Sequence, residues 1–243
     1  MRVPSLWAIR REGMDCGSSL SLSVHPMIDF AQARTQMVEN QLRTVGISDK
    51  RLLAAMMAVP REHFVAPAQK PIAYTDVVLP IGVGRFLAAP APFAKLVQLA
   101  EIGEKDAVLD VGAGTGYSTA VLAAMSGEVT ALESDPALAD IARRNLTELG
   151  IASVRLVDSP VDGSYAPGRL FDVVVIEGAV DQEPSAFFPL LADGGRLVAL
   201  IRNGSVATAQ LYVRSGGEVA GRADFNAALP ALPLGPRPQA FVF

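Results

Sequence analysis

Three glycines at alternate positions are the residues whose spacing most clearly suggests chemistry. Gly112, Gly114 and Gly116 follow an apolar run and precede a segment with helical spacing. A turn of this kind lets the backbone approach a ligand closely, beside the first N–H groups of a helix. The glycines therefore predict a nucleotide-binding loop over residues 108–117.

An acidic residue lies where such a loop needs one. Glu133 closes the next apolar run, about 20 residues after Gly112. From the end of a neighbouring strand, a carboxylate can accept hydrogen bonds from both hydroxyls of a ribose. Strand, glycines, helix and acid in this register predict a nucleoside-containing ligand.

Two features favour S-adenosylmethionine over a dinucleotide. The G-x-G-x-G spacing is one residue tighter than the G-x-G-x-x-G of nicotinamide binders. Asp110 precedes the first glycine by two residues, and its charge would repel a pyrophosphate but attract an ammonium and a sulfonium. One alternative is that the glycines only form a tight turn and Asp110 only caps the helix. A nicotinamide-dependent oxidoreductase is the other.

The elements that must position this loop are short apolar runs separated by helical segments. Such near-continuous runs are typical of parallel strands that are covered on both faces. The expected strands are 107–111, 129–132, 154–157, 173–176 and 197–201, followed by strand-like pieces 207–213, 217–225 and 240–243. The expected helices between them are 118–125, 136–149 and 184–191. The pattern predicts an α/β fold with a doubly wound, mostly parallel, seven-stranded sheet.

The amino-terminal part has a different pattern of apolar residues, prolines and glycines. Helical spacing from Met27 predicts a helix that ends at Gly46, and a second helix is expected from the Ser48-Asp49 cap to just before Pro60. Prolines and glycines then predict loop structure from Ala66 to Pro92. This stretch is therefore expected to form a helical subdomain with an attached substrate loop.

These sequence patterns also predict the domain organisation. We expect residues 1–26, rich in serine and without an apolar core for a secretory signal, to be a disordered extension. Residues 27–243 are expected to form one domain, with residues 27–92 carrying the helices and substrate loop and residues 93–243 the cofactor-binding core. Met27 would then be the natural start.

Composition restricts the functional classes. The net charge of −4 makes a broad surface for nucleic acid unexpected. One cysteine and two histidines leave little for a metal site, so no metal is expected. The single cysteine also suits a reducing compartment, and no apolar run is long enough to span a membrane. These features predict a cytoplasmic protein; the oligomeric state is left open.

Several segments together resemble the protein-L-isoaspartate O-methyltransferases, a family of class I S-adenosylmethionine-dependent methyltransferases. The amino-terminal ones are the more discriminating, because generic methyltransferases lack them. The similar segments are Met37–Arg43, Arg51–Arg61, Phe64-Val65, Ala73–Asp76, Leu79–Gly84, Phe171-Asp172 and Asp193–Val198. The resemblance covers roughly residues 28–202.

The resemblance implies a carboxyl O-methyltransferase that uses S-adenosyl-L-methionine to methylate isoaspartyl residues of damaged proteins, the first step in their repair. A carboxylate is already ionised at neutral pH, so the chemistry requires no general base. Positioning and the exclusion of water would supply the rate. The partner would be a protein or peptide with a free isoaspartyl-like carboxylate, without a role for nucleic acid or membrane.

The resemblance also implies which residues contact the ligands. We expect Arg85 and Ala88 to be the catalytic-site residues that contact the acceptor. The expected cofactor contacts are Asp110, Gly112, Ala113, Gly114, Thr115, Gly116, Tyr117, Glu133, Ser134, Asp158, Ser159 and Glu177.

The acceptor segment departs from the family pattern Gly-Gln-Thr-Ile-Ser-Gln-Pro. The aligned run here is Gly84-Arg-Phe-Leu-Ala-Ala-Pro90, so Phe86 replaces the Thr and Ala88 replaces the Ser. Losing a hydrogen bond to a charged group costs about 1.5–3 kcal/mol. Arg85, at the Gln position, could bind a carboxylate bidentately instead, or be a solvated loop arginine.

The adenine and strand-end positions depart as well. Pro160 replaces the Asp that receives the adenine amino group in the family, which leaves Asp158 or backbone groups near Ser159 to hold adenine. Glu177 follows a strand where the family has a small residue, and it either contacts a ligand or is solvated. The alternatives to isoaspartyl methylation are therefore the same scaffold with another acceptor, or a cofactor-binding protein without that activity.

Overall fold

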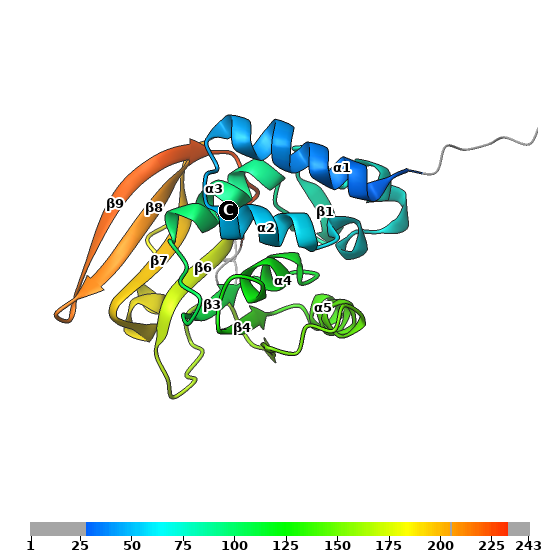
Figure 1. The fold of residues 1–243 in the computed structure, drawn as a ribbon. Helices are drawn as coiled ribbons and strands as arrows, with labels where there is room; N and C mark the ends of the chain where they lie inside the picture. Colours follow the sequence, from blue (N-terminus) through cyan, green and yellow to red (C-terminus); the bar gives the residue numbers. More distant parts are fainter. Residues whose placement is uncertain (1–27, 205, 233–243) are drawn as a thin grey trace, which may run out of the picture.

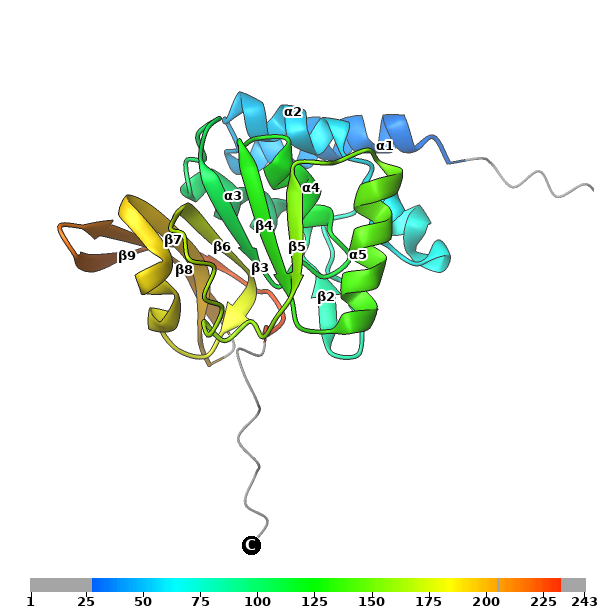
Figure 2. The same ribbon diagram turned by 90° about the horizontal axis from the view of Figure 1, so that it is seen from below.

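The computed structural model describes residues 28–204 and 206–232. The amino-terminal extension and the expected strand 240–243 lie outside these residues. One seven-stranded sheet forms the centre of the fold, with the order β5-β4-β3-β6-β7-β8-β9 (Figure 2). Its strands are β3 (Ala107–Val111), β4 (Glu128–Glu133), β5 (Val154–Asp158), β6 (Phe171–Val180), β7 (Leu191–Asn203), β8 (Val206–Ser215) and β9 (Glu218–Ala227).

The five strands from β3 to β7 are parallel, and β8 and β9 continue the sheet as antiparallel neighbours. The chain enters at β3, moves outward to β4 and β5, and crosses back to β6 on the other side of β3. Ligands of such sheets bind where the strand order reverses, at the carboxyl ends. The predicted mostly parallel α/β class is confirmed, and this topology places the ligand edge next to β3 and β6.

The helices lie on one side of the sheet in two layers, an inner one that packs on the strands and an outer one formed by the two amino-terminal helices (Figure 1). They are α1 (Phe30–Gln36), α2 (Lys50–Ala58), α3 (Pro90–Leu99), α4 (Tyr117–Ala123) and α5 (Pro136–Glu148). The opposite face carries a second apolar cluster in which Val161, Phe187 and Leu232 cover strand residues. The helix expected over 184–191 is the short 3₁₀ turn η5 (Ser185–Leu190). Turns and the late segment at Leu232 therefore cover this face in place of a long helix.

The two amino-terminal helices begin and end where the local signals predict. The first continues from α1 through the π-helical η1 (Met37–Leu42) and the 3₁₀ turn η2 (Arg43–Val45) to Gly46, whose φ of 91° favours glycine. Asp49 caps α2 by accepting from the backbone N–H groups of Arg51 and Leu52. Gly46 and the Asp49 cap explain why these boundaries were readable in the sequence.

The expectation of loop structure from Ala66 to Pro92 is wrong in part. After the 3₁₀ turns η3 (Arg61–Phe64) and η4 (Pro67–Ile72), the chain forms an antiparallel pair, β1 (Leu79–Gly82) and β2 (Arg85–Leu87). Helix α3 starts at Pro90 itself, because proline fits the first helical turn, where its missing N–H has no partner to lose. The pair β1–β2 projects this segment toward the ligand edge.

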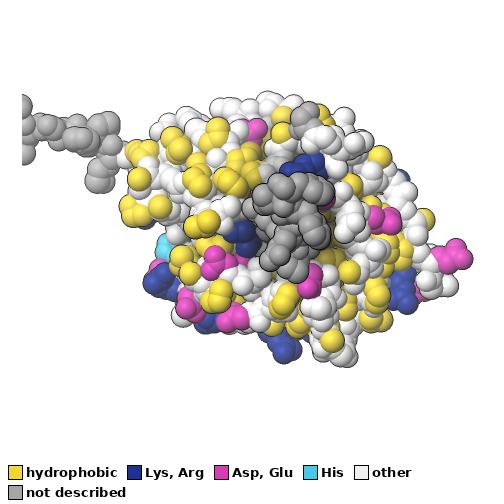
Figure 3. Space-filling model, turned by 180° about the vertical axis from the view of Figure 1, so that it is seen from behind, with side chains coloured by type: hydrophobic (Ala, Val, Ile, Leu, Met, Phe, Trp, Pro, Cys, Tyr) yellow, Lys and Arg dark blue, Asp and Glu magenta, His cyan; other side chains and the backbone are white. Residues whose placement is uncertain are grey.

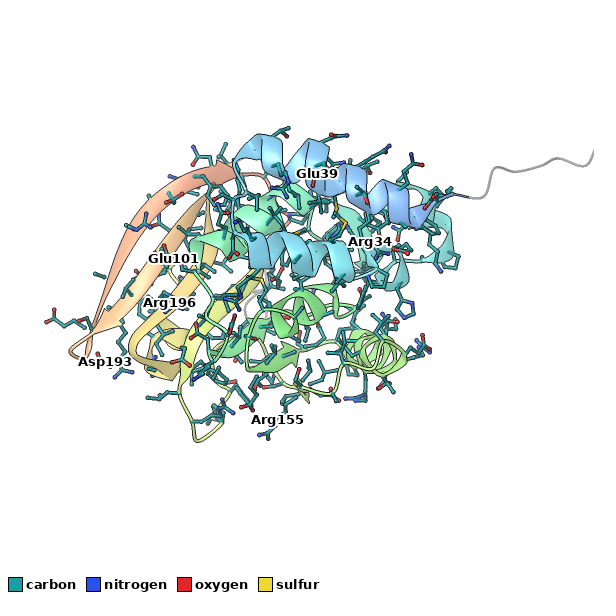
Figure 4. The ribbon with its side chains drawn as sticks, in the orientation of Figure 1. Arg34, Glu39, Glu101, Arg155, Asp193 and Arg196 are labelled. Atoms are coloured by element: carbon teal, nitrogen blue, oxygen red, sulfur yellow. The ribbon has the colours of Figure 1, made fainter. Side chains whose placement is uncertain are left out.

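Arginine side chains tie the helical layer together and to the sheet (Figure 4). Arg34 of α1 donates through Nε to the Tyr74 hydroxyl at 2.8 Å and forms an ion pair with Glu62. Arg196 of β7 donates to the Ala100 carbonyl at 2.7 Å and pairs with Asp106 at 2.6 Å. Among the described residues no helix is long and apolar enough to cross a membrane.

Candidate functional site

Parallel pairing brings the predicted acidic residues to one edge of the sheet. Glu133 pairs in register with Asp158 at the ends of β4 and β5. Asp110 lies near the end of β3, where the register pairs it with Val175 of β6, two residues before Glu177. The structure therefore gathers the predicted cofactor residues of four strands next to the glycine loop.

The glycine loop leaves β3 in a conformation that favours glycine. Gly112, Gly114 and Gly116 have φ values of 88°, 58° and 95°. A Cβ at Gly112 would lie 2.8 Å from a Leu232 methyl, and one at Gly114 would lie 2.6 Å from the Ile81 Cδ1. Side chains are therefore excluded here both by backbone strain and by close neighbours, as the prediction of a close-approach loop requires.

Glu133 is fully buried and held by backbone donors. Its Oε2 accepts from the Gly114 N–H at 2.7 Å, and its Oε1 accepts from the Ser134 and Asp135 N–H groups at 2.9 Å. These bonds fix the carboxylate beside the glycine loop. Ser134, predicted as a cofactor contact, contributes its backbone N–H to this arrangement.

Arg85 occupies the remaining side of Glu133. Residues alternate along β2, so that Arg85 and Leu87 face inward and Phe86 outward. The Arg85 guanidinium forms a two-pronged ion pair with Glu133, in which Nη2 lies 2.7 Å from Oε2, and Nη2 also donates to the Gly112 carbonyl at 3.2 Å. Arg85 is thus not a solvated loop residue, and here it binds a cofactor-site carboxylate. Its predicted role toward the acceptor stays a prediction.

Only one of the two carboxylate oxygens of Asp110 has hydrogen-bond partners. Its Oδ2 accepts from the hydroxyls of Ser118 at 2.9 Å and Thr119 at 2.6 Å, while Oδ1 is buried without a partner. Burial raises the pKa of Asp110 to about 6, against the opposing effect of the two hydroxyls. Asp110 therefore both anchors the start of α4 and retains one oxygen for a ligand.

Glu177 lies in a bulge of β6. The register of β6 against β7 breaks between Val175 and Ala179, and Gly178 within the break has a φ of 145°. The Glu177 Oε1 is enclosed without a hydrogen-bond partner, although part of the residue is accessible. Burial raises the pKa of Glu177 well above its ordinary value, and the nearby Asp110 adds to the rise. Glu177 is therefore not a simple solvated acid.

The remaining loop residues join the site to the helical layer. Thr115 donates through Oγ1 to the Phe64 carbonyl at 2.7 Å, and its own carbonyl accepts from the Asn145 side chain at 2.9 Å. The Tyr117 ring packs with Phe64 and Phe93 at 5.6 and 5.7 Å between ring centres. Thr115 and Tyr117 thus hold the loop in place.

The predicted adenine side is more open. Asp158 is about half exposed and pairs with Arg143 of α5 at 3.1 Å. The Ser159 N–H donates to the Glu133 carbonyl at 3.1 Å, which places Ser159 next to the residue predicted to bind the ribose. Contact of Asp158 or Ser159 with adenine remains a prediction.

Three residues of the site were missed by sequence reasoning. Ile81 of β1 and Leu232 lie against the glycine loop, and Arg61 of η3 lies fully buried over the Tyr117 ring. Leu232 reaches the loop because its N–H donates to the Ala179 carbonyl at 2.8 Å. The only feature of the sequence that could have indicated Arg61 is its charge in the short segment between Pro60 and Phe64. No feature of the neighbouring sequence indicates Leu232.

The residues present fit S-adenosylmethionine. The glycine loop offers a surface free of side chains, Glu133 is an oriented carboxylate for ribose hydroxyls, and Asp110 and Glu177 retain unpartnered acidic oxygens for a cationic ligand. Because Arg85 already occupies Glu133, ribose hydroxyls would share or replace its hydrogen bonds. In residues 28–204 and 206–232, no three His, Cys, Asp or Glu side chains form a group suited to a metal ion.

Comparison with known families agrees with this site. The sequence profile of the family described as Protein-L-isoaspartate(D-aspartate) O-methyltransferase (PCMT) matches residues 32–229. The match includes the helical layer, the pair β1–β2 and the whole sheet. It therefore extends well beyond the glycine loop.

Individual relatives carry the same name. A protein-L-isoaspartate O-methyltransferase of Koribacter versatilis (strain Ellin345) is 39% identical over 184 residues, covering 76% of this chain and 82% of its own. Another, of Methylorubrum extorquens (strain PA1), is 42% identical over 174 residues, covering 71% of this chain and 75% of its own.

Solved structures show the same fold. One titled protein-L-isoaspartate O-methyltransferase superposes with a TM-score of 0.73 at 25% identity, covering 83% of this chain and 67% of its own. A putative protein-L-isoaspartate O-methyltransferase of Plasmodium falciparum, solved with S-adenosyl-L-homocysteine, gives a TM-score of 0.70 at 21% identity. It covers 83% of this chain and 99% of its own.

Proposed function

Because the chain belongs to the protein-L-isoaspartate O-methyltransferase family, we propose that it methylates the free carboxylate of isoaspartyl residues in proteins or peptides. It is an S-adenosylmethionine-dependent methyltransferase, as its family and its glycine loop agree. The proposal that the acceptor is an isoaspartyl carboxylate needs support from the geometry of the site.

One observation carries the proposal: the acceptor segment touches the cofactor loop directly. Arg85, within Gly84–Pro90, bonds both the Gly112 carbonyl and Glu133. Two segments far apart in sequence are thus joined at the point where a methyl group would have to pass between them. An acceptor held by Gly84–Pro90 would therefore lie beside the cofactor, as methyl transfer requires.

Methyl transfer to a carboxylate depends on the relative position of the carboxylate and the methyl group more than on proton transfer. The cofactor, when bound, supplies a methyl group on a positively charged sulfur. An ionised carboxylate is already a nucleophile, so no residue has to remove a proton. Asp110 and Glu177 can bind the positively charged end of the cofactor, while Ile81 and Leu232 cover the loop and exclude water.

A protein acceptor also needs an accessible surface near this point. Several exposed apolar side chains belong to the segment around β1 and β2, among them Val83, which is fully exposed, and Phe86, which is 41% exposed. Figure 3 shows apolar side chains gathered on the left of the face that it draws. This surface supports a peptide segment as the partner, in place of nucleic acid or a membrane. The single cysteine supports a cytoplasmic location.

The decisive experiment is methyl transfer to a synthetic isoaspartyl peptide, with the aspartyl peptide of the same sequence as control. We expect base-labile methyl ester on the isoaspartyl peptide only. Binding of S-adenosylhomocysteine, measured by calorimetry, verifies that the protein sample is intact. Cofactor binding without transfer to the isoaspartyl peptide would contradict the proposal and favour a different acceptor on the same scaffold.

A further inference from the structure

Arg61 is the most deeply buried arginine of the described chain, and its hydrogen bonds are incomplete. It has no solvent-exposed surface. Its Nε donates to the Ala73 carbonyl at 2.7 Å and its Nη2 to the Ala88 carbonyl at 2.5 Å. Its Nη1 is buried without a hydrogen-bond partner. The side chain is thus fixed in place with one donor group left free.

Arg61 also lacks a counter-ion. Within the part of the chain that the structure describes, no carboxylate lies within ion-pair distance of its guanidinium, although Arg34 and Arg85 both have one. Burial lowers the pKa of Arg61, but an arginine guanidinium stays charged in proteins. A buried charge without a partner is strongly unfavourable. An anion at Nη1 would supply the missing partner.

The position of Arg61 limits what this anion can be. Through Ala88 it supports the acceptor segment, and its guanidinium lies 4.7 Å from the ring centre of Tyr117, which begins α4 after the glycine loop. The Tyr117 hydroxyl is a second buried donor without a partner. The guanidinium and the Tyr117 hydroxyl thus lie close together between the acceptor segment and the cofactor loop, near enough for Arg61 to oppose the rise that burial causes in the pKa of Tyr117.

We infer that Arg61 binds the acceptor carboxylate through Nη1, with the Tyr117 hydroxyl as a neighbouring donor. This rests on the proposed function. It explains how the segment Gly84–Pro90 can serve a carboxylate although Phe86 and Ala88 have no hydroxyl groups. A guanidinium suits this task, because its charge-assisted hydrogen bonds are about twice as strong as those of neutral donors.

The nearby acids assign the cofactor and the acceptor to different groups. Asp110 and Glu177, whose free oxygens suit a cation, lie on β3 and β6, whereas Arg61 lies on η3 and supports the acceptor segment. Arg61 forms no ion pair with Glu177 but is near enough to lower the pKa of its carboxyl, so the cation and anion positions would be adjacent. The positive end of the cofactor would face the two acids. The acceptor carboxylate would then face Arg61, opposite the methyl group. Arg85, committed to Glu133, is not available for the same anion in this arrangement.

The test is kinetic and uses the full chain with Arg61→Gln and Arg61→Lys. For Arg61→Gln we expect KM for the isoaspartyl peptide to rise roughly ten- to a hundredfold, with the affinity for S-adenosylhomocysteine within about twofold of wild type. Lysine keeps the charge and should recover part of the loss. Arg34→Gln is the matched control, since Arg34 lies in the same layer but has its own counter-ion, and KM should not change.

Two results would overturn the inference. An unchanged KM in Arg61→Gln would show that Arg61 only supports backbone carbonyls. A loss of S-adenosylhomocysteine binding as large as the loss of peptide binding would assign the free donor to the carboxylate of the cofactor. If neither Arg61 variant folds, Tyr117→Phe decides: it keeps the ring that packs behind the loop, and KM for the peptide should rise several-fold, by more than any loss of S-adenosylhomocysteine affinity.

A second measurement does not depend on turnover. With S-adenosylhomocysteine bound, glutarate should raise the melting temperature of the wild type, and its neutral analogue glutaramide should not. Arg61→Lys or Tyr117→Phe should reduce the effect. If no isoaspartyl peptide is methylated, the proposed function fails while this measurement still tests Arg61. Equal effects of glutarate and glutaramide would overturn the role of Arg61.

Discussion

Two buried arginines near the glycine loop differ in how fully their guanidinium groups are paired. Arg85 bonds Glu133 twice and the Gly112 carbonyl once, and Glu133 in turn accepts from three backbone N–H groups. Arg61 has two backbone partners and no counter-ion among the described residues. The hydrogen bonds around Glu133, the predicted ribose-binding residue, are thus complete without a ligand, whereas those of Arg61 are not.

The difference teaches how each corner would respond to a ligand. At Glu133 a ligand has to exchange with hydrogen bonds that already exist, so the gain in free energy is the difference between two good arrangements. At Arg61 a ligand supplies hydrogen bonds that are missing, and the full cost of a buried unpaired group is recovered. The first corner sets the geometry of the loop, and the second favours an anion.

Glu133→Gln should have the largest effect. The change leaves Arg85 buried without its counter-ion, which costs about 3–5 kcal/mol of unfolding free energy. It also weakens binding of S-adenosylhomocysteine by roughly a hundredfold or more, because ribose hydroxyls lose a charged acceptor. Urea unfolding and calorimetry measure the two losses.

Glu128→Gln is the control for that change, since Glu128 begins the same strand and pairs with Arg169 at the surface. Its effect should stay below about 1 kcal/mol. Equal destabilisation by the two substitutions would show that the Glu133–Arg85 corner is not special.

Gly114→Ala should have the next largest effect. Alanine at a positive φ costs about 1–2 kcal/mol, and the clash with Ile81 adds about 1–3 kcal/mol. Gly150→Ala has a similar φ of 67° with nothing near its Cβ, so it should show the first cost alone and leave cofactor binding unchanged. Equal losses in thermal unfolding would argue against a close approach at Gly114.

The ionisation of Asp110 should give a smaller, pH-dependent effect. Burial raises the pKa of Asp110 to about 6 in the folded protein, above its value in the unfolded chain. The folded state therefore binds more protons between these values, and this contribution to stability is lost as pH rises from about 4 to about 7. Binding of the cationic cofactor should strengthen over the upper part of the same range.

Asp110→Asn isolates this contribution. The difference in unfolding free energy between wild type and variant, measured in urea across that pH range, should fall with rising pH. A difference that stays constant with pH would show that Asp110 does not titrate there.

Asp158→Asn should have the smallest effect on stability, below about 1 kcal/mol, because Asp158 is half exposed. If its carboxylate accepts from the adenine amino group, S-adenosylhomocysteine should bind about tenfold less tightly. Asp140→Asn removes the other exposed acid that pairs with Arg143 and should leave binding unchanged. Unchanged binding in both variants would assign adenine to backbone groups.

Much of the fold was predictable because its signals are local. Buried parallel strands appear as short apolar runs, and β3 has the predicted bounds. A cap at Asp49 and a left-handed Gly46 fix helix ends within a few residues of themselves. The pair β1–β2 was missed because its strands are short and flanked by prolines, so its pairing depends on tertiary contacts.

The residues of the site also divide into those that contiguous sequence patterns predict and those that depend on tertiary contacts. The glycines and Glu133 were identifiable because the loop and the strand end are contiguous patterns. The pairing of Arg85 with Glu133 was not, because it joins residues of two elements that meet only in the folded protein. Arg61 was equally hidden, since its importance lies in one donor group that the surrounding backbone leaves unused.

The contact of Leu232 with Gly112 has a consequence for the order in which the site is assembled. The residues that surround the cofactor loop extend from Arg61 to Leu232, so they emerge from the ribosome at different times. Arg85, the glycine loop and Glu133 are synthesised well before residues 230–232, and the hydrogen bonds of Ala179 with Pro230 and Leu232 form only after those residues have been made. A nascent chain that has not reached Leu232 therefore has an uncovered cofactor loop.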